Sequence, residues 1–209
     1  MPTSDPFRYL ESGTALTGDL PRDVVAYLGA HGCPRTAAHS AAVAAEARRL
    51  ALSFGVEAPA AEAAGWLHDV SAVIPVAERL PAARAWRVPV LPEERAAPML
   101  LHQKLSAVLA RRLFGVADAA MLQAIGCHTT LRSGATMLDQ VLFVADKVAW
   151  DQPGEPPYLA AVRAGLERSL AAAARAYLRY LWEQRDTLPA VHPWMAEAYR
   201  ALSAAEDRR

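Results

Sequence analysis

The sequence predicts an all-α protein built as a single helical bundle. Apolar residues make up 53% of its 209 residues, and alanine, the best helix former, dominates their runs. Apolar positions recur at helical spacing, as in Val43, Ala47, Leu50 and Phe54. No stretch shows the sustained period-two alternation expected of a strand. We expect an N-terminal tail at residues 1–18 and one domain at residues 19–205.

Start and stop signals divide the chain into helices. Gly32 and Pro34 end the first helix, and Gly55 stands where a C-terminal cap is expected for the second. Several prolines between residues 71 and 95 leave room for little more than a helical turn. An alanine-rich run at 158–185 predicts one long helix with a packing face, either within the chain or as a homodimer contact. The predicted helical segments are 19–30, 35–54, 60–69, 76–87, 99–114, 118–128, 137–150, 158–185 and 193–203.

Charge and cysteine content exclude several classes of protein. Lys+Arg and Asp+Glu both number 22, so no bulk field attracts nucleic acid or an anionic membrane. Charges interrupt every apolar run before it reaches membrane-spanning length, and we see no signal peptide. Two cysteines, Cys33 and Cys127, do not make a disulfide framework. We therefore expect a cytoplasmic protein that binds neither nucleic acid nor membrane.

Histidines and aspartates on apolar helix faces predict a metal site. Asp146 lies four residues after Leu142 in an otherwise apolar run, and a buried carboxylate is costly without a partner such as a metal. One histidine on such a face is more often a core residue, but several together favour ligation. Imidazole and carboxylate suit iron, manganese, cobalt or zinc, and a site without cysteine argues against closed structural zinc. The candidate ligands are His39, His68, Asp69, His102, His128 and Asp146.

The adjacent pair His68-Asp69 needs a special backbone position to reach one centre. Neighbouring side chains of a helix diverge by about 100°. Both can point to one centre where the helix ends, and Pro75 predicts an end soon after this pair.

Five segments resemble the YqeK-type branch of the HD-domain phosphohydrolases, over about residues 20–203. The ordered series H…HD…H…H…D, with HTT and ADK in place, is far more specific than an H-D dipeptide alone. The segments are AAHSAAVAAEARRLA, GWLHDVSAVIP, LLHQKLSA, AIGCHTTLRSGATMLDQVLFVADKV and HPWMAEAYRAL. The resemblance implies an all-α fold with a dinuclear centre. In it, His39, His68, Asp69 and Asp146 bind one metal, His102 and His128 complete the second, and Asp69 bridges.

The family resemblance also implies a reaction, its metal ions and the residues that take part in it. It implies symmetrical hydrolysis of dinucleoside tetraphosphates, chiefly of diadenosine tetraphosphate to two ADP. The reaction would use two divalent or trivalent metal ions. Iron is the first candidate for these ions, and manganese, cobalt and zinc are the alternatives. His68, Asp69 and Arg132 are the candidate catalytic residues. Arg132, Lys104 and Lys147 are candidate phosphate contacts, with solvated surface charge as the alternative for each.

Three departures from the family pattern leave the substrate open. Ala72 stands where a lysine is common, Gln103 where a glycine is usual, and residues 147–154 lack the usual glutamate-proline pair and arginine. Trp150 in that segment is either a core residue or a base-stacking one. Alternative functions are therefore another nucleotide phosphohydrolase, acting on a nucleoside monophosphate, a deoxynucleoside triphosphate or an alarmone, or a non-catalytic module that binds metal or nucleotide.

Overall fold

The computed structural model describes residues 7, 10 and 15–206 and confirms the all-α fold. Within these residues every regular element is a helix. In chain order they are α1 Leu20–Ala30, α2 Pro34–Phe54, α3 Ala58–Leu67, η2 Val70–Val73, α4 Val76–Ala85, α5 Pro92–Ala96, η3 Pro98–Leu101, α6 His102–Arg112, α7 Ala119–Cys127, α8 Met137–Val148, α9 Leu159–Leu166, α10 Leu170–Glu183, η4 Arg185–Thr187 and α11 Pro193–Glu206.

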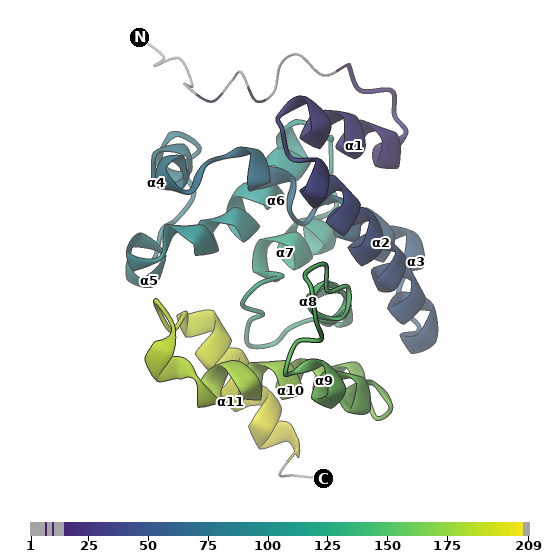
Figure 1. Ribbon diagram of the computed structural model, residues 1–209, viewed down its shortest axis with the longest axis vertical. Coiled ribbons are helices and arrows are strands. Elements are labelled where there is room, and N and C mark those ends of the chain that lie inside the picture. The colour runs from purple at the N-terminus through teal and green to yellow at the C-terminus, as the bar shows by residue number, and fades with distance from the viewer. Residues whose placement is uncertain (1–6, 8–9, 11–14, 207–209) are drawn as a thin grey trace.

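The helices form two groups joined by α8 (Figure 1). Helices α2 and α3 lie side by side, and α6 and α7 pack next to them in the upper part of the view. The last three helices, α9 to α11, gather at the lower end, and α8 contacts both groups. Fully buried α8 residues such as Leu142 and Phe143 therefore link the two groups through one hydrophobic core.

A glycine sets the distance between α2 and α3. A Cβ atom at Gly65 would lie 2.5 Å from the Cα atom of Ala44, closer than real Cβ contacts. The two backbones therefore touch, and residues near the contact have little freedom to shift. This contact fixes the end of α3, where His68 lies, relative to the α2 helix that carries His39.

The single long helix predicted at 158–185 is wrong, because the chain folds back between α9 and α10. Ser169 has an extended backbone and its side chain accepts a hydrogen bond from the amide of Ala172, so it caps a new helix. A Cβ atom at Gly165 would lie 2.6 Å from the Cα atom of Ala173. The glycine thus permits two helices to pack backbone to backbone. Helical periodicity continued through the break and hid it.

The predicted tail, residues 1–18, falls partly outside the described residues, which omit 1–6, 8–9 and 11–14. Two residues inside it are buried: Phe7, whose ring centroid lies 6.0 Å from that of Trp86, and Leu10. Part of this segment thus packs against the core, and the domain boundary at 19 stays a prediction. No helix among the described residues is long and apolar enough to cross a membrane.

Candidate metal centre

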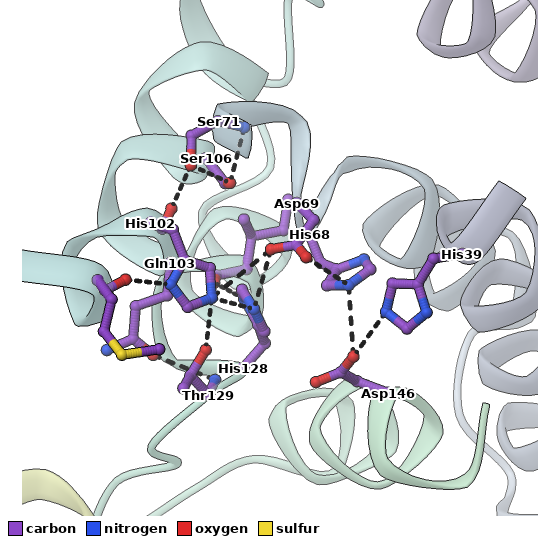
Figure 2. Close-up of polar contacts among 12 residues, drawn as sticks. His39, His68, Asp69, Ser71, His102, Gln103, Ser106, His128, Thr129 and Asp146 are labelled. Carbon is purple, nitrogen blue, oxygen red and sulfur yellow. Dashed lines mark hydrogen bonds and ion pairs between the residues drawn. The ribbon is translucent and has the colours of Figure 1, made fainter. Parts of the chain in front are cut away.

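The six predicted ligands converge on one point from five helices (Figure 2). Four of them lie at helix ends, where side chains can leave the helix surface. His68 follows the last residue of α3, Asp69 links α3 to η2, His102 begins α6 and His128 follows the last residue of α7. The remaining two, His39 and Asp146, project from within α2 and α8.

Asp69 lies at the centre of the cluster. Its Oδ1 atom is 3.6 Å from the Nε2 atoms of both His102 and His128, and its Oδ2 atom is 3.7 Å from Nε2 of His68. The two carboxylate oxygens therefore face different histidines. This position between two sets of donors agrees with the bridging role that the family resemblance implies for Asp69.

Asp146 organises the other side of the cluster. Its Oδ1 atom lies 3.0 Å from Nε2 of His39 and 3.5 Å from Nε2 of His68. Two groups of donor atoms, each with its members within 4.8 Å of one another, have the geometry to hold a metal ion, and they share His68. The groups are His39, His68 and Asp146, and His68, Asp69 and His128.

Backbone carbonyls orient three of the imidazoles. The Nδ1 atoms of His68, His102 and His128 lie 2.8, 2.6 and 2.8 Å from carbonyl oxygens three residues earlier in the chain. A carbonyl only accepts, so each Nδ1 carries the proton and donates it. The Nε2 atoms then turn toward the cluster, and such a hydrogen bond also makes an imidazole a better metal ligand.

The donor atoms fit a metal ion. The Nε2 atom of His68 is buried and has no hydrogen-bond partner within the described residues. The Nε2 atoms of His102 and His128 lie 3.1 Å apart, although both rings carry their proton on Nδ1. A set of imidazole nitrogens and carboxylate oxygens without sulfur suits divalent first-row ions rather than closed structural zinc.

Electrostatics also favour a cation in this cluster. Burial would raise the pKa of Asp69, but the surrounding imidazoles lower it to about 2. Burial disfavours the charged form of His68, yet Asp69 and Asp146 raise its pKa to about 9. Burial and the neighbouring histidines lower the pKa of His128 to about 3. Both carboxylates are thus ionised at neutral pH in a buried site, which draws in positive charge.

Buried polar residues hold the ligand-bearing segments together. The Ser71 hydroxyl donates to the backbone oxygen of His102 at 2.8 Å, and Ser106 Oγ donates to Ser71 Oγ at 2.9 Å. This pair ties η2, next to Asp69, to the start of α6. Gln103 accepts from the amides of Thr129 and Thr130 at 3.2 and 3.3 Å. Gln103, which departs from the family pattern, therefore anchors the loop that follows His128 by hydrogen bonds.

A cleft of about 340 Å³ opens beside the first group of ligands. Arg35, Lys147, Trp150, Tyr158 and Tyr177 line it together with His39, Asp69 and Asp146. Lys147 is buried and its ammonium pairs with Asp146. The Arg35 guanidinium is exposed, and within the described residues it has no ion-pair or hydrogen-bond partner. The cleft thus presents two cations next to the ligands.

The structure does not bring Lys104 and Arg132 to this cleft. Lys104 pairs at 2.7 Å with Glu94, which is fully buried, and donates to the carbonyl of Pro89 at 3.1 Å. Arg132 binds the buried carboxylate of Asp139 at 2.8 Å. Both line a different hollow, of about 430 Å³.

Three residues near the centre escaped the sequence analysis. Arg79 donates to the carbonyls of Ile74 at 3.2 Å and Met99 at 2.8 Å, and its charge acts on Asp69. Thr129 Oγ1 lies 2.8 Å from Nε2 of His102. Arg35 stands one helical turn before His39, which is the one sequence signal that would have found it. Thr129 belongs to the HTT motif, which marks it in the sequence, whereas the contacts of Arg79 depend on how distant segments fold together.

Comparison with known proteins agrees with this geometry. The model of the HD domain family matches residues 36–151, which contain all six candidate ligands. An uncharacterised protein in the pepC 5′ region of Lactococcus lactis subsp. cremoris is 39% identical over 139 residues, 66% of this chain and 70% of that protein. The symmetrical bis(5′-nucleosyl)-tetraphosphatase of Bacillus subtilis (strain 168) is 34% identical over 110 residues, 53% of this chain and 59% of that protein.

A solved structure shares the fold. The crystal structure of a predicted HD superfamily hydrolase involved in NAD metabolism from Clostridium acetobutylicum superposes with a TM-score of 0.80 at 22% identity, over 92% of this chain and all of that one. The family match spans more than half of the chain and its ligands meet at one centre. The chain therefore belongs to the HD-domain family of hydrolases, as the resemblance to its YqeK-type branch predicted.

Proposed function

We propose that this chain hydrolyses symmetrical dinucleoside tetraphosphates, chiefly diadenosine tetraphosphate to two molecules of ADP. The observation that carries the hydrolytic part is the position of Asp69, within 3.6–3.7 Å of three imidazole Nε2 atoms. The finer choice of substrate is supported by the name of the Bacillus subtilis relative. We also propose that the protein works in the cytoplasm.

Two metal ions fit the proposed reaction, with iron first and manganese, cobalt or zinc as alternatives. His39, His68, Asp69 and Asp146 would hold one, and His102 and His128 would complete the second, with Asp69 contributing to both. Bound cations supply Lewis acidity, which lowers the pKa of water toward neutrality and offsets charge on phosphoryl oxygens. No side chain among the ligands needs to act as a covalent nucleophile.

The residues of the chain itself orient the ligands and the substrate. Carbonyl hydrogen bonds keep the Nε2 atoms of His68, His102 and His128 directed inward. Arg35 lines the cleft beside the centre and presents positive charge to a phosphate chain. Lys147 lines the same cleft, with its ammonium paired to Asp146. The low pKa of Asp69 keeps its carboxylate ionised at neutral pH. Preorganised charge of this kind stabilises a phosphoryl transition state.

Product analysis tests this proposal. Purified protein, loaded in turn with iron, manganese, cobalt and zinc, is incubated with diadenosine tetraphosphate and the products are separated by chromatography. We expect two ADP per substrate cleaved. Release of ATP and AMP would contradict symmetrical cleavage.

The second candidate, an HD-domain phosphohydrolase with another nucleotide substrate, has one specific observation in its favour. Ala72, in η2, brings no cation to the centre where the family commonly has a lysine. A panel with a nucleoside monophosphate, a deoxynucleoside triphosphate and a guanosine tetraphosphate is run in parallel. Faster cleavage of a panel member than of diadenosine tetraphosphate would favour this candidate. No turnover together with less than one bound metal per chain would favour a non-catalytic module.

A further inference from the structure

A second pocket, of about 240 Å³, lies next to the metal centre and is apolar rather than charged. One wall comes from η3 and the loop after α7, and the other from α10 and residues 188–195. The residues that line it most clearly are Met99, Thr129, Tyr177, Leu181, Leu188 and Met195. No lysine or arginine is among the described residues that line it.

This pocket contacts the metal centre directly. The carbonyl of Met99 accepts the Nδ1 proton of His102, and the hydroxyl of Thr129 lies 2.8 Å from Nε2 of the same ring. Tyr177 lines both this pocket and the charged cleft. The pocket and the charged cleft beside the metal centre therefore adjoin at Tyr177.

We propose that this pocket is the nucleobase subsite of the centre and takes the heteroaromatic ring of a nucleotide whose phosphates lie at the metal ions. This inference rests on the proposed nucleotide substrate. A neutral, flat ring suits a pocket with apolar walls and no cation, whereas a phosphate does not. The thioethers of Met99 and Met195 pack well against aromatic faces, and threonine hydroxyls supply hydrogen bonds at the edge.

The exposure of Met99 supports this assignment. Its side chain is 52% exposed and lines the pocket. Leu181 and Leu188, which line the same pocket, are only half-buried. Together they form an apolar rim, which a bound ring covers.

The two walls of the pocket come from different parts of the chain, one within the family match and one beyond it. The family match ends at residue 151, so it contains the metal ligands, Met99 and Thr129. The opposite wall, with Tyr177, Leu181 and Leu188, lies beyond it. The metal centre thus lies within the family match and this wall lies outside it, as expected of a subsite that selects a base.

Two substitutions of half-buried residues at the rim test the subsite. Leu188→Glu introduces a carboxylate, and Ala190→Trp fills the pocket. Leu52→Glu, at a leucine that is 66% exposed near the end of α2, is the matched control. Binding of ADP and of pyrophosphate to the metal-loaded protein is measured by calorimetry. Pyrophosphate offers the same phosphates without a base, so it reports on the folded metal centre alone.

We expect both rim variants to weaken ADP binding about 10-fold, the size of one lost base-stacking contact, with pyrophosphate binding unchanged and the control like wild type. Unchanged ADP binding in both variants, or parallel weakening of both ligands, would overturn the inference. The proposed reaction is tested separately by turnover. If wild type does not cleave diadenosine tetraphosphate, that function fails, while the comparison of ADP with pyrophosphate still decides the subsite.

Discussion

His102 and His128 face each other through their Nε2 atoms at 3.1 Å, and neither ring has a proton to place between them. Both donate Nδ1–H to a backbone carbonyl, and burial lowers the pKa of each ring. Two acceptor nitrogens therefore lie close together in a buried site, and the Thr129 hydroxyl, 2.8 Å from Nε2 of His102, is the one donor near them among the described residues. A cation bound there turns this close approach of acceptors into ligation, so metal and fold are thermodynamically linked.

Metal removal is therefore expected to lower thermal stability. Chelator-treated protein should unfold at lower temperature than metal-loaded protein, by the equivalent of about 3–4 kcal/mol when metal is in large excess over its Kd. Scanning calorimetry measures this. His68→Ala should abolish both bound metal and the shift, whereas His31→Ala, at a ring that bonds only the carbonyl of Tyr27 and packs on its ring, should retain both. A metal-independent melting temperature in wild type would contradict the assigned centre.

Arg35→Ala is expected to weaken substrate use without loss of metal. The guanidinium lines the cleft and has no partner among the described residues, so it is available to a phosphate. Loss of one charge-assisted contact should lower kcat/KM about 10-fold. Arg22→Ala, at an exposed arginine in the first turn of α1, is the control. Equal kinetics in both variants would exclude Arg35 from phosphate binding.

Arg132→Ala distinguishes a structural role from phosphate contact. Asp139 is fully buried and pairs with Arg132, so the variant should lose about 3 kcal/mol of unfolding free energy. Arg163→Ala, in an exposed pair with Glu155, should cost less than about 1 kcal/mol. Urea denaturation measures both. A raised KM with unchanged stability would instead support the phosphate contact expected from the sequence.

Glu94→Gln should change how stability depends on pH. Burial would raise the pKa of Glu94, but hydrogen bonds from His192, Leu91 and Lys104 hold it below its usual value in the folded protein. The carboxylate therefore contributes stability above its unfolded pKa, and this contribution is lost as pH falls through the folded value. Wild type should lose more unfolding free energy between pH 6 and pH 3 than the variant does. Parallel urea-denaturation curves across this range would contradict the prediction.

Cys127 is expected to resist alkylation. Burial raises the pKa of its thiol to about 12, and Sγ donates to the carbonyl of Ala124 at 3.7 Å. Cys33 is only half-buried and serves as the internal control. Mass spectrometry after iodoacetamide treatment of native protein at pH 8 should find label on Cys33 first. Faster labelling of Cys127 would show that its thiol is accessible.

The candidate ligands could be named from the sequence because each left a local mark in it. A carboxylate in an apolar run, as at Asp146, and histidines at helix ends are anomalies that only a partner explains. The same reading failed for Lys104 and Arg132, since nothing in their spacing shows that Glu94 and Asp139 would fold against them. A charged side chain near a ligand in sequence can leave the helix on the opposite face.

The break between α9 and α10 is a second feature that the sequence alone did not predict. Apolar periodicity runs through residues 158–185, and Gly165 alone does not predict a turn. Its effect appears only when Ala173 packs against it, which is a contact between helices. The apolar pocket depends on that fold-back, because α10 supplies one of its walls.

His39 and Asp146 contact each other across 107 residues of chain. An ion held by both closes a loop of that size, as a disulfide would, in a chain whose two cysteines are both free. Unlike a disulfide, the ion leaves when its ligands separate, so it adds its binding free energy to the folded state and does not constrain the unfolded chain. The centre thus doubles as a removable cross-link: loading it should slow global unfolding, and stripping it should first release the segment that carries α2.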